Sequence, residues 1–118
     1  MINALLNARP NVSLPVVEWT EAAIDDLADI YDYIEHFNPT AAQELRDTIT
    51  QGVASLLTRM PHLFRKGRIK GTREFVAHPN YLVVYKPTSR RIRILRVLHT
   101  KRKFPNSETP DGFPPRYN

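Results

Sequence analysis

Apolar side chains recur three or four residues apart through the first half of the chain, which is the period of helices that bury one face. The first stretch spans residues 21–36 and follows Thr20, a residue type that caps helix N-termini. Its apolar positions are Ile24, Leu27, Tyr31 and Ile34. The second stretch spans residues 39–60, with Asn38-Pro39 as its start signal and Pro61 as its end. Its apolar positions are Ala41, Leu45, Ile49, Val53, Leu56 and Met60. Because few residues separate the two helices, we expect them to pack as an antiparallel hairpin.

Shorter apolar stretches predict four strands, at residues 14–19, 73–77, 81–86 and 91–98. The last three are joined by short turns, which require antiparallel neighbours. The last strand is apolar on both faces near its end, as a central strand would be. Residues 61–71 are predicted to form an irregular basic connector.

The predicted order is therefore β-α-α-β-β-β. It indicates an α+β fold in which a helical hairpin covers one face of a small, twisted, mainly antiparallel sheet. The length of 118 residues suits a single domain, which we place at residues 14–105. Residues 1–13 are expected to be an N-terminal extension. Residues 106–118 contain three prolines and one glycine and are expected to be an irregular tail.

Composition narrows the cellular setting. The chain has no cysteine, so it has no disulfide framework and no thiolate chemistry. It has no apolar run near the ~20 residues of a membrane span, and its first ten residues lack the basic start of a signal peptide. We therefore expect a cytoplasmic protein with no membrane partner.

The charge is divided unevenly between the two halves of the chain. The net charge is +5, yet residues 1–60 carry nine acidic and three basic side chains, whereas residues 61–118 carry three acidic and fourteen basic ones. A basic half favours an anionic partner, either nucleic acid or an acidic protein segment. The alternative is that the surplus cations only solvate the surface.

The candidate chemistry lies in the basic half. The four histidines, His36, His62, His78 and His99, lack metal-ligand spacing, and no glycine-rich phosphate loop is present, so no metal or cofactor is expected. The positions that combine phosphate-pairing cations with rings are Arg73, Arg96, Lys101, Arg102, Lys103, Tyr81, Tyr85, His99 and Phe104. Such a set could cleave RNA without metal, with a histidine or tyrosine as general base, or could simply bind single strands.

Some of these residues also have structural explanations. Tyr85 lies in the middle of a strand, where a core ring and a functional ring are equally good interpretations. Arg73 and Glu74 are neighbours in a strand and therefore point to opposite faces. Arg96 is unusual within an apolar strand, and we expect it to pair with an acidic side chain of the first helix.

The segments GTREFVAHPNYLVVYK and RILRVLHTKRKFP resemble the C-terminal half of ParE-type toxins of the RelE/ParE superfamily. The upstream segment VEWTEAAIDDLADIYDYIEHFNPTAAQELRDTI is similar to the helical hairpin of the same family. The resemblance covers residues 16–105. Its most specific parts are Thr72-Arg73-Glu74, the pair Tyr81 and Tyr85, and Leu98-His99 leading into Arg102 and Pro105.

The resemblance implies a toxin of a bacterial type II toxin–antitoxin module, of the kind found in plasmid stabilisation loci. ParE members are described as DNA gyrase poisons, whereas the ribosome-dependent RelE members cleave mRNA. The nuclease branch usually has an arginine directly after the first tyrosine of the strand at residues 81–86, and here that residue is Leu82. We therefore expect a non-enzymatic gyrase inhibitor that causes growth arrest.

Two alternatives remain. One is a ribosome-dependent mRNA endoribonuclease, for which the candidate catalytic residues are Arg73, Tyr81, His99 and Arg102. The other is a non-toxic remnant that only binds an antitoxin.

The resemblance also implies partners. The cognate antitoxin would supply an acidic segment that folds on binding, and the chain could form a homodimer or a toxin–antitoxin hetero-oligomer. The expected partner- or target-binding residues are Arg73, Glu74, His78, Asn80, Tyr81, Lys101, Arg102, Lys103 and Phe104.

Overall fold

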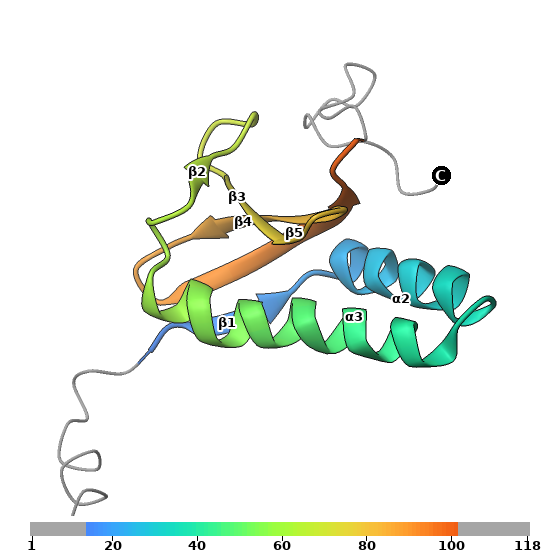
Figure 1. Cartoon of the computed structure of the whole chain (residues 1–118). Coiled ribbons are helices and arrows are strands. Elements are labelled where there is room, and N and C mark those ends of the chain that lie inside the picture. Colours follow the sequence, from blue (N-terminus) through green and yellow to red (C-terminus); the bar gives the residue numbers. More distant parts are fainter. Residues whose placement is uncertain (1–13, 102–118) are drawn as a thin grey trace, which may run out of the picture.

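A helical hairpin lies across one face of a five-stranded sheet in the computed structural model, which describes residues 14–101 (Figure 1). The α+β architecture predicted from the sequence is confirmed. The elements in chain order are β1 (Val16–Trp19), α2 (Glu21–Glu35), α3 (Pro39–Gly52), the π-helical segment η1 (Val53–Leu57), β2 (Arg65–Lys66), β3 (Arg73–His78), β4 (Tyr81–Pro87) and β5 (Arg91–His99). The proposed N-terminal extension, residues 1–13, and tail, residues 106–118, lie outside the described residues.

The strand order is β1-β5-β4-β3-β2, with β1 parallel to β5 and all other pairs antiparallel. The prediction that the last strand is internal is confirmed, because β5 has a strand on each side. The prediction that residues 61–71 are wholly irregular is wrong, since β2 pairs there with Arg73 and Glu74 of β3. A strand of two residues is too short to leave an alternating pattern in the sequence.

Both helices begin at the predicted caps. The Thr20 hydroxyl accepts a hydrogen bond from the Ala23 N–H at 3.3 Å and donates one to the Ile94 carbonyl of β5 at 2.8 Å. The Asn38 side chain accepts from the Ala41 N–H at 3.0 Å. Thr20 therefore does two jobs, because it starts α2 and also ties that start to the sheet.

The second helix departs from the predicted apolar stripe at its end. Leu56 and Met60 are partly exposed, and Leu57 is fully buried in their place. The physical reason is η1, whose π turn holds more residues than an α turn. Within this turn the buried side moves four residues on, from Val53 to Leu57. The stripe therefore continues the spacing of Leu45 and Ile49 in α3 instead of shifting to Leu56.

The main core lies between the helices and the sheet. It takes Leu45, Ile49, Val53 and Leu57 from the helical hairpin, and its members from the sheet are Phe75, Val83, Tyr85, Ile92, Ile94 and Val97. A smaller apolar cluster on the opposite face of the sheet consists of Leu82, Val84 and Leu98. Tyr85 is therefore a core ring, and its hydroxyl donates to the Pro61 carbonyl at 2.7 Å.

A buried ion pair fixes α2 against the edge of β5. Strand β1 ends at Trp19 opposite Ile94, whereas β5 continues to His99. Beyond that point the Asp26 carboxylate of α2 accepts the Val97 N–H at 2.9 Å. It also accepts Arg96 Nε at 2.6 Å and Arg96 Nη2 at 2.9 Å. The predicted pairing of Arg96 with an acid of the first helix is confirmed.

Replacing Asp26 by alanine should strongly destabilise the fold. It would leave Arg96 buried without its carboxylate and the Val97 N–H without its acceptor, and breaking such a pair costs about 3–5 kcal/mol. The measurement is the free energy of unfolding in urea. Asp32→Ala, an exposed acid on the same helix, is the control and should change it by under about 0.5 kcal/mol. Equal losses in the two variants would contradict the assignment.

Tyr85→Phe should cost about 1 kcal/mol at neutral pH, because it removes the hydrogen bond to Pro61. Burial raises the pKa of Tyr85 to about 12, although the nearby Arg73 lowers it in part. A phenol whose pKa is higher in the folded state stabilises the fold below the unfolded-state pKa of about 10, and this contribution is lost as pH rises through about 12. Urea unfolding across this alkaline range should show a smaller loss of stability in Tyr85→Phe than in the parent. If both proteins lost the same stability over this pH range, ionisation of groups other than Tyr85 would be responsible for the loss.

Candidate functional site

Several predicted interaction residues gather where the β3–β4 turn meets the end of β5. Tyr81 lies opposite His99 on β5, and their ring centroids are 5.3 Å apart. The His78 ring is 5.9 Å from Tyr81 on its other side. The Nδ1 atoms of His78 and His99 accept the backbone N–H groups of Asn80 and Lys101, each at 3.1 Å. Each neutral imidazole then carries its proton on Nε2 and acts there as a donor.

Tyr81 is poorly suited to act as a general base. Burial, with a smaller contribution from Tyr33, raises its pKa above the usual value of 10.0. The phenol is therefore protonated at neutral pH and serves as a hydrogen-bond donor or acceptor rather than as a phenolate. The cluster of His78, Tyr81 and His99 can recognise a partner through its rings and donors.

Arg73 lies far from this cluster. It pairs with Tyr85 on β4, four residues from Tyr81, which corresponds to about 13 Å along the strand. Its Nη1 donates to the carbonyls of His62 and Phe64, at 3.1 and 2.7 Å. The fold thus brings Tyr81 and His99 together and leaves Arg73 at the other end of β3.

Glu74, the next predicted interaction residue, is buried. Its carboxylate pairs with Arg65 at 2.9 Å and with Arg68 at 3.2 Å. It also accepts the Arg68 backbone N–H at 3.2 Å. These bonds give Glu74 a structural role in holding residues 65–68 against β3.

The remaining predicted positions lie near the end of the described chain. Lys101 is exposed just after β5. Arg102, Lys103 and Phe104 lie outside the described residues.

Leu82 is 2% exposed and packs with Val84 and Leu98 in the smaller apolar cluster. Partly buried Ile69 and Leu95 complete this cluster. Because side chains alternate along β4, Leu82 lies on the face opposite Tyr81 and Tyr85. Its apolar side chain offers no donor to a phosphate.

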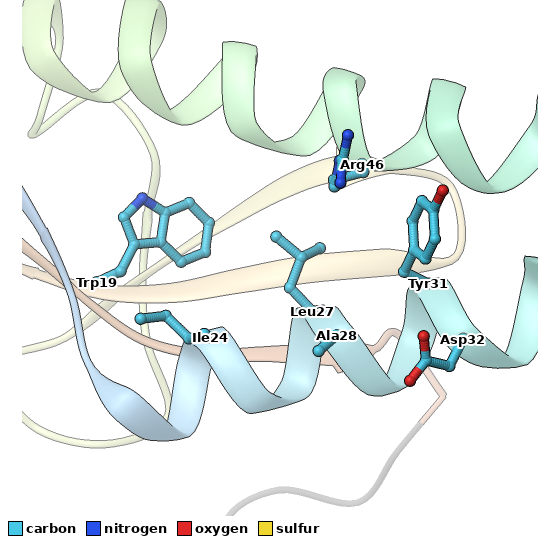
Figure 2. A pocket seen from close by; sticks show the side chains of 7 residues that line it. All are labelled: Trp19, Ile24, Leu27, Ala28, Tyr31, Asp32 and Arg46. Carbon is cyan, nitrogen blue, oxygen red and sulfur yellow. The ribbon is translucent and has the colours of Figure 1, made fainter.

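Sequence reasoning missed a groove between α2 and α3, shown in Figure 2. Its volume is about 280 Å³, and its lining residues are Trp19, Ile24, Leu27, Ala28, Tyr31, Asp32 and Arg46. Arg46 of α3 places its guanidinium 5.1 Å from the centre of the Tyr31 ring, a cation–π contact that bridges the two helices. Ile24 was expected in the buried stripe, yet it is 52% exposed.

A sequence signal for this groove did exist. Ile24, Ala28 and Asp32 are spaced four apart and form one row along α2, beside the row of Leu27 and Tyr31. Ala28, the small residue in the middle of the first row, leaves space beside the larger side chains of Leu27 and Tyr31. The apolar lining with one cation and one anion at its side can hold an amphipathic segment.

Metal and membrane features give no further site. Within residues 14–101 no three histidine, aspartate or glutamate side chains are placed to hold a metal ion. No helix in that part of the chain has the length and apolar character needed to cross a membrane.

Comparison with known proteins places the chain among toxins. The model of the family "ParE toxin of type II toxin-antitoxin system, parDE" matches residues 17–104. The Y4kP protein of Sinorhizobium fredii is 38% identical over 90 residues, which are 75% of this chain and 92% of that protein. Toxin RelE2 of Caulobacter vibrioides is 34% identical over 88 residues, which are 73% of this chain and 96% of that protein.

Solved structures share the fold. A chain of the chromosomal ParDE system of P. aeruginosa superposes with a TM-score of 0.66 at 21% identity, over 75% of this chain and 98% of the other. A chain of the toxin–antitoxin complex RelBE2 of Mycobacterium tuberculosis gives a TM-score of 0.54 at 21% identity, over 74% and 99%.

Proposed function

Because the chain belongs to the ParE toxin family of type II toxin–antitoxin systems, we propose that it arrests bacterial growth by binding DNA gyrase without cutting RNA. The observation that carries this proposal is Leu82, which is buried in an apolar cluster where the nuclease branch of the superfamily would carry a phosphate-binding arginine. The toxin would act in the cytoplasm, where its target is found.

The separation of the candidate nuclease residues supports the same choice. General acid–base cleavage needs the base and the phosphate-stabilising cation within hydrogen-bond reach of one phosphate. Arg73 is instead held on two backbone carbonyls at the far end of β3 from His99. The raised pKa of Tyr81 lowers the fraction of the phenolate at neutral pH, which is the form that could accept a proton.

The second candidate is a ribosome-dependent mRNA endoribonuclease. Its specific support is the contact between Tyr81 and His99, together with the relative named toxin RelE2. The third is a remnant that binds an antitoxin without being toxic.

A cognate antitoxin would dock an amphipathic, acidic segment in the groove between α2 and α3. Apolar side chains of the segment would cover Ile24 and Leu27, and an acidic one would pair with Arg46. The solved relatives come from a ParDE system and a RelBE2 toxin–antitoxin complex, which supports a partner of this kind.

Expression of the chain alone should stop bacterial growth, and the purified protein should inhibit gyrase supercoiling in proportion to its concentration. A translation extract should show no codon-linked mRNA cuts. His99→Ala and Arg73→Ala are the informative variants, because cuts that appear with the parent and vanish in both would establish the endoribonuclease instead. Supercoiling that proceeds unchanged at high toxin excess would rule out gyrase, and normal growth would indicate the remnant.

Ile24→Asp should weaken binding of the antitoxin, taken as the product of the neighbouring reading frame with a DNA-binding N-terminus and an acidic helical tail. Loss of one buried aliphatic side chain corresponds to tenfold or more in Kd. Leu63→Asp is the matched control, because Leu63 is 64% exposed and does not line the groove. Titration calorimetry gives both constants, and an unchanged Kd for Ile24→Asp would exclude the groove.

A further inference from the structure

The connection between β2 and β3 forms a second hollow, at the opposite end of β3 from Tyr81. Its volume is about 400 Å³, and its lining residues are His62, Lys66, Gly67, Lys70, Gly71, Thr72, Arg73 and Pro87. Volumes of this size are typical of small-molecule sites. Three cationic side chains and two glycines in the wall give it an anion-binding character.

The loop that makes this hollow is held in one shape. The Gly67 N–H donates to the Thr72 carbonyl at 2.7 Å, and the Thr72 hydroxyl donates to the Ile69 carbonyl at 2.6 Å. A side chain at Gly67 would collide with the Thr72 hydroxyl, since a Cβ would lie 2.2 Å from it. Gly71 has a φ of 84°, which favours glycine. A preformed loop binds a ligand without the cost of ordering.

Glu74 pairs with some of the cations of this loop and not with others. Residues 65–70 contain four cations, and the buried Glu74 carboxylate pairs with two of them, Arg65 and Arg68. The other two, Lys66 and Lys70, line the hollow. The internal carboxylate therefore fixes the loop and leaves the pocket cations to an external anion.

The cations of the hollow have no internal counter-charge in the part of the chain that the structure describes. No ion pair there joins Lys66, Lys70 or Arg73 to a carboxylate. Arg73 is fixed by two carbonyl groups, which orient its guanidinium and leave its charge uncompensated. The side chain of exposed Lys86 also reaches this loop, since its Cε lies 3.7 Å from where a Cβ of residue 71 would stand.

We propose that this hollow binds a phosphate group of a polynucleotide backbone. A phosphate oxyanion suits a hollow whose wall holds one planar guanidinium and two lysine side chains. A polynucleotide is favoured over an isolated phosphate because positive charge continues beyond the hollow. Arg65 and Arg68 share the single Glu74 carboxylate and keep one net positive charge at the partly exposed surface, and exposed Lys86 adds another. This site lies apart from the α2–α3 groove and does not depend on gyrase being the target.

Inorganic phosphate tests the pocket itself. Amide resonances of Gly67, Gly71 and Thr72 should shift on titration, and Lys70→Ala should weaken binding at least threefold. Arg59→Ala removes the same charge from an exposed residue that does not line the hollow and should bind phosphate as the parent does. Absence of these shifts, or an equal loss in both variants, would overturn the proposal, because the second result means that the protein attracts anions only by its net charge.

A labelled single-stranded oligonucleotide and adenosine monophosphate test the source of the phosphate. The oligonucleotide should bind more tightly than adenosine monophosphate. In the double variant Lys66→Ala/Lys70→Ala, checked for folding by circular dichroism, the slope of log K for the oligonucleotide against log salt concentration should be smaller by about 1–2. Equal affinity for the mononucleotide and the oligonucleotide would overturn the assignment to a polynucleotide, as would an unchanged salt dependence. Failure of gyrase inhibition would leave both measurements unaffected.

Discussion

The ion pair between Asp26 and Arg96 is the constraint on which the arrangement of helices and sheet depends. Strand β1 stops at Trp19, so the edge of β5 beyond it would present unpaired backbone groups. The Asp26 carboxylate takes the place of a neighbouring strand by accepting the Val97 N–H. Because the same carboxylate also neutralises Arg96, one side chain closes the sheet edge, satisfies a buried cation and fixes the position of α2.

Glu74 repeats this device at the other side of the sheet. Both buried carboxylates accept a backbone N–H together with guanidinium groups, Asp26 from Val97 and Arg96, and Glu74 from Arg68 and Arg65. Asp26 attaches a helix to β5, and Glu74 attaches the basic loop to β3. These carboxylates neutralise buried or partly buried arginines inside the fold, and the other cations among residues 61–101 are partly or fully exposed. Part of the basic charge of the C-terminal half therefore serves the fold, through arginines paired with Asp26 and Glu74, and the rest lies at the surface.

The sequence predicted the elements whose signals are local. The caps Thr20 and Asn38, the antiparallel strands and the partner of Arg96 followed from residue types and periodicity. The features it did not predict depend on tertiary context. Strand β2 forms where Glu74 holds Arg65 against β3. One wall of the groove can be read from the spacing of residues along α2, but the side chain of Arg46 that faces it comes from α3. For the site, the sequence grouped Arg73 with Tyr81 and His99. In the structure Arg73 lies on β3 opposite Tyr85, which is four residues from Tyr81 along β4. This register between strands is not visible in a single sequence.

The π turn at Val53–Leu57 sets the rotational phase of everything that follows it. Each residue of an α-helix turns the chain by about 100°, so removing one residue here would swing the helix end around by that angle. The carbonyls of Pro61, His62 and Phe64 come soon after the turn, and they hold the Tyr85 hydroxyl and the Arg73 guanidinium. The number of residues in Val53–Leu57 therefore fixes the direction in which the chain leaves the helix. Insertions and deletions in this stretch should be far less tolerated among functional relatives than substitutions that keep its length.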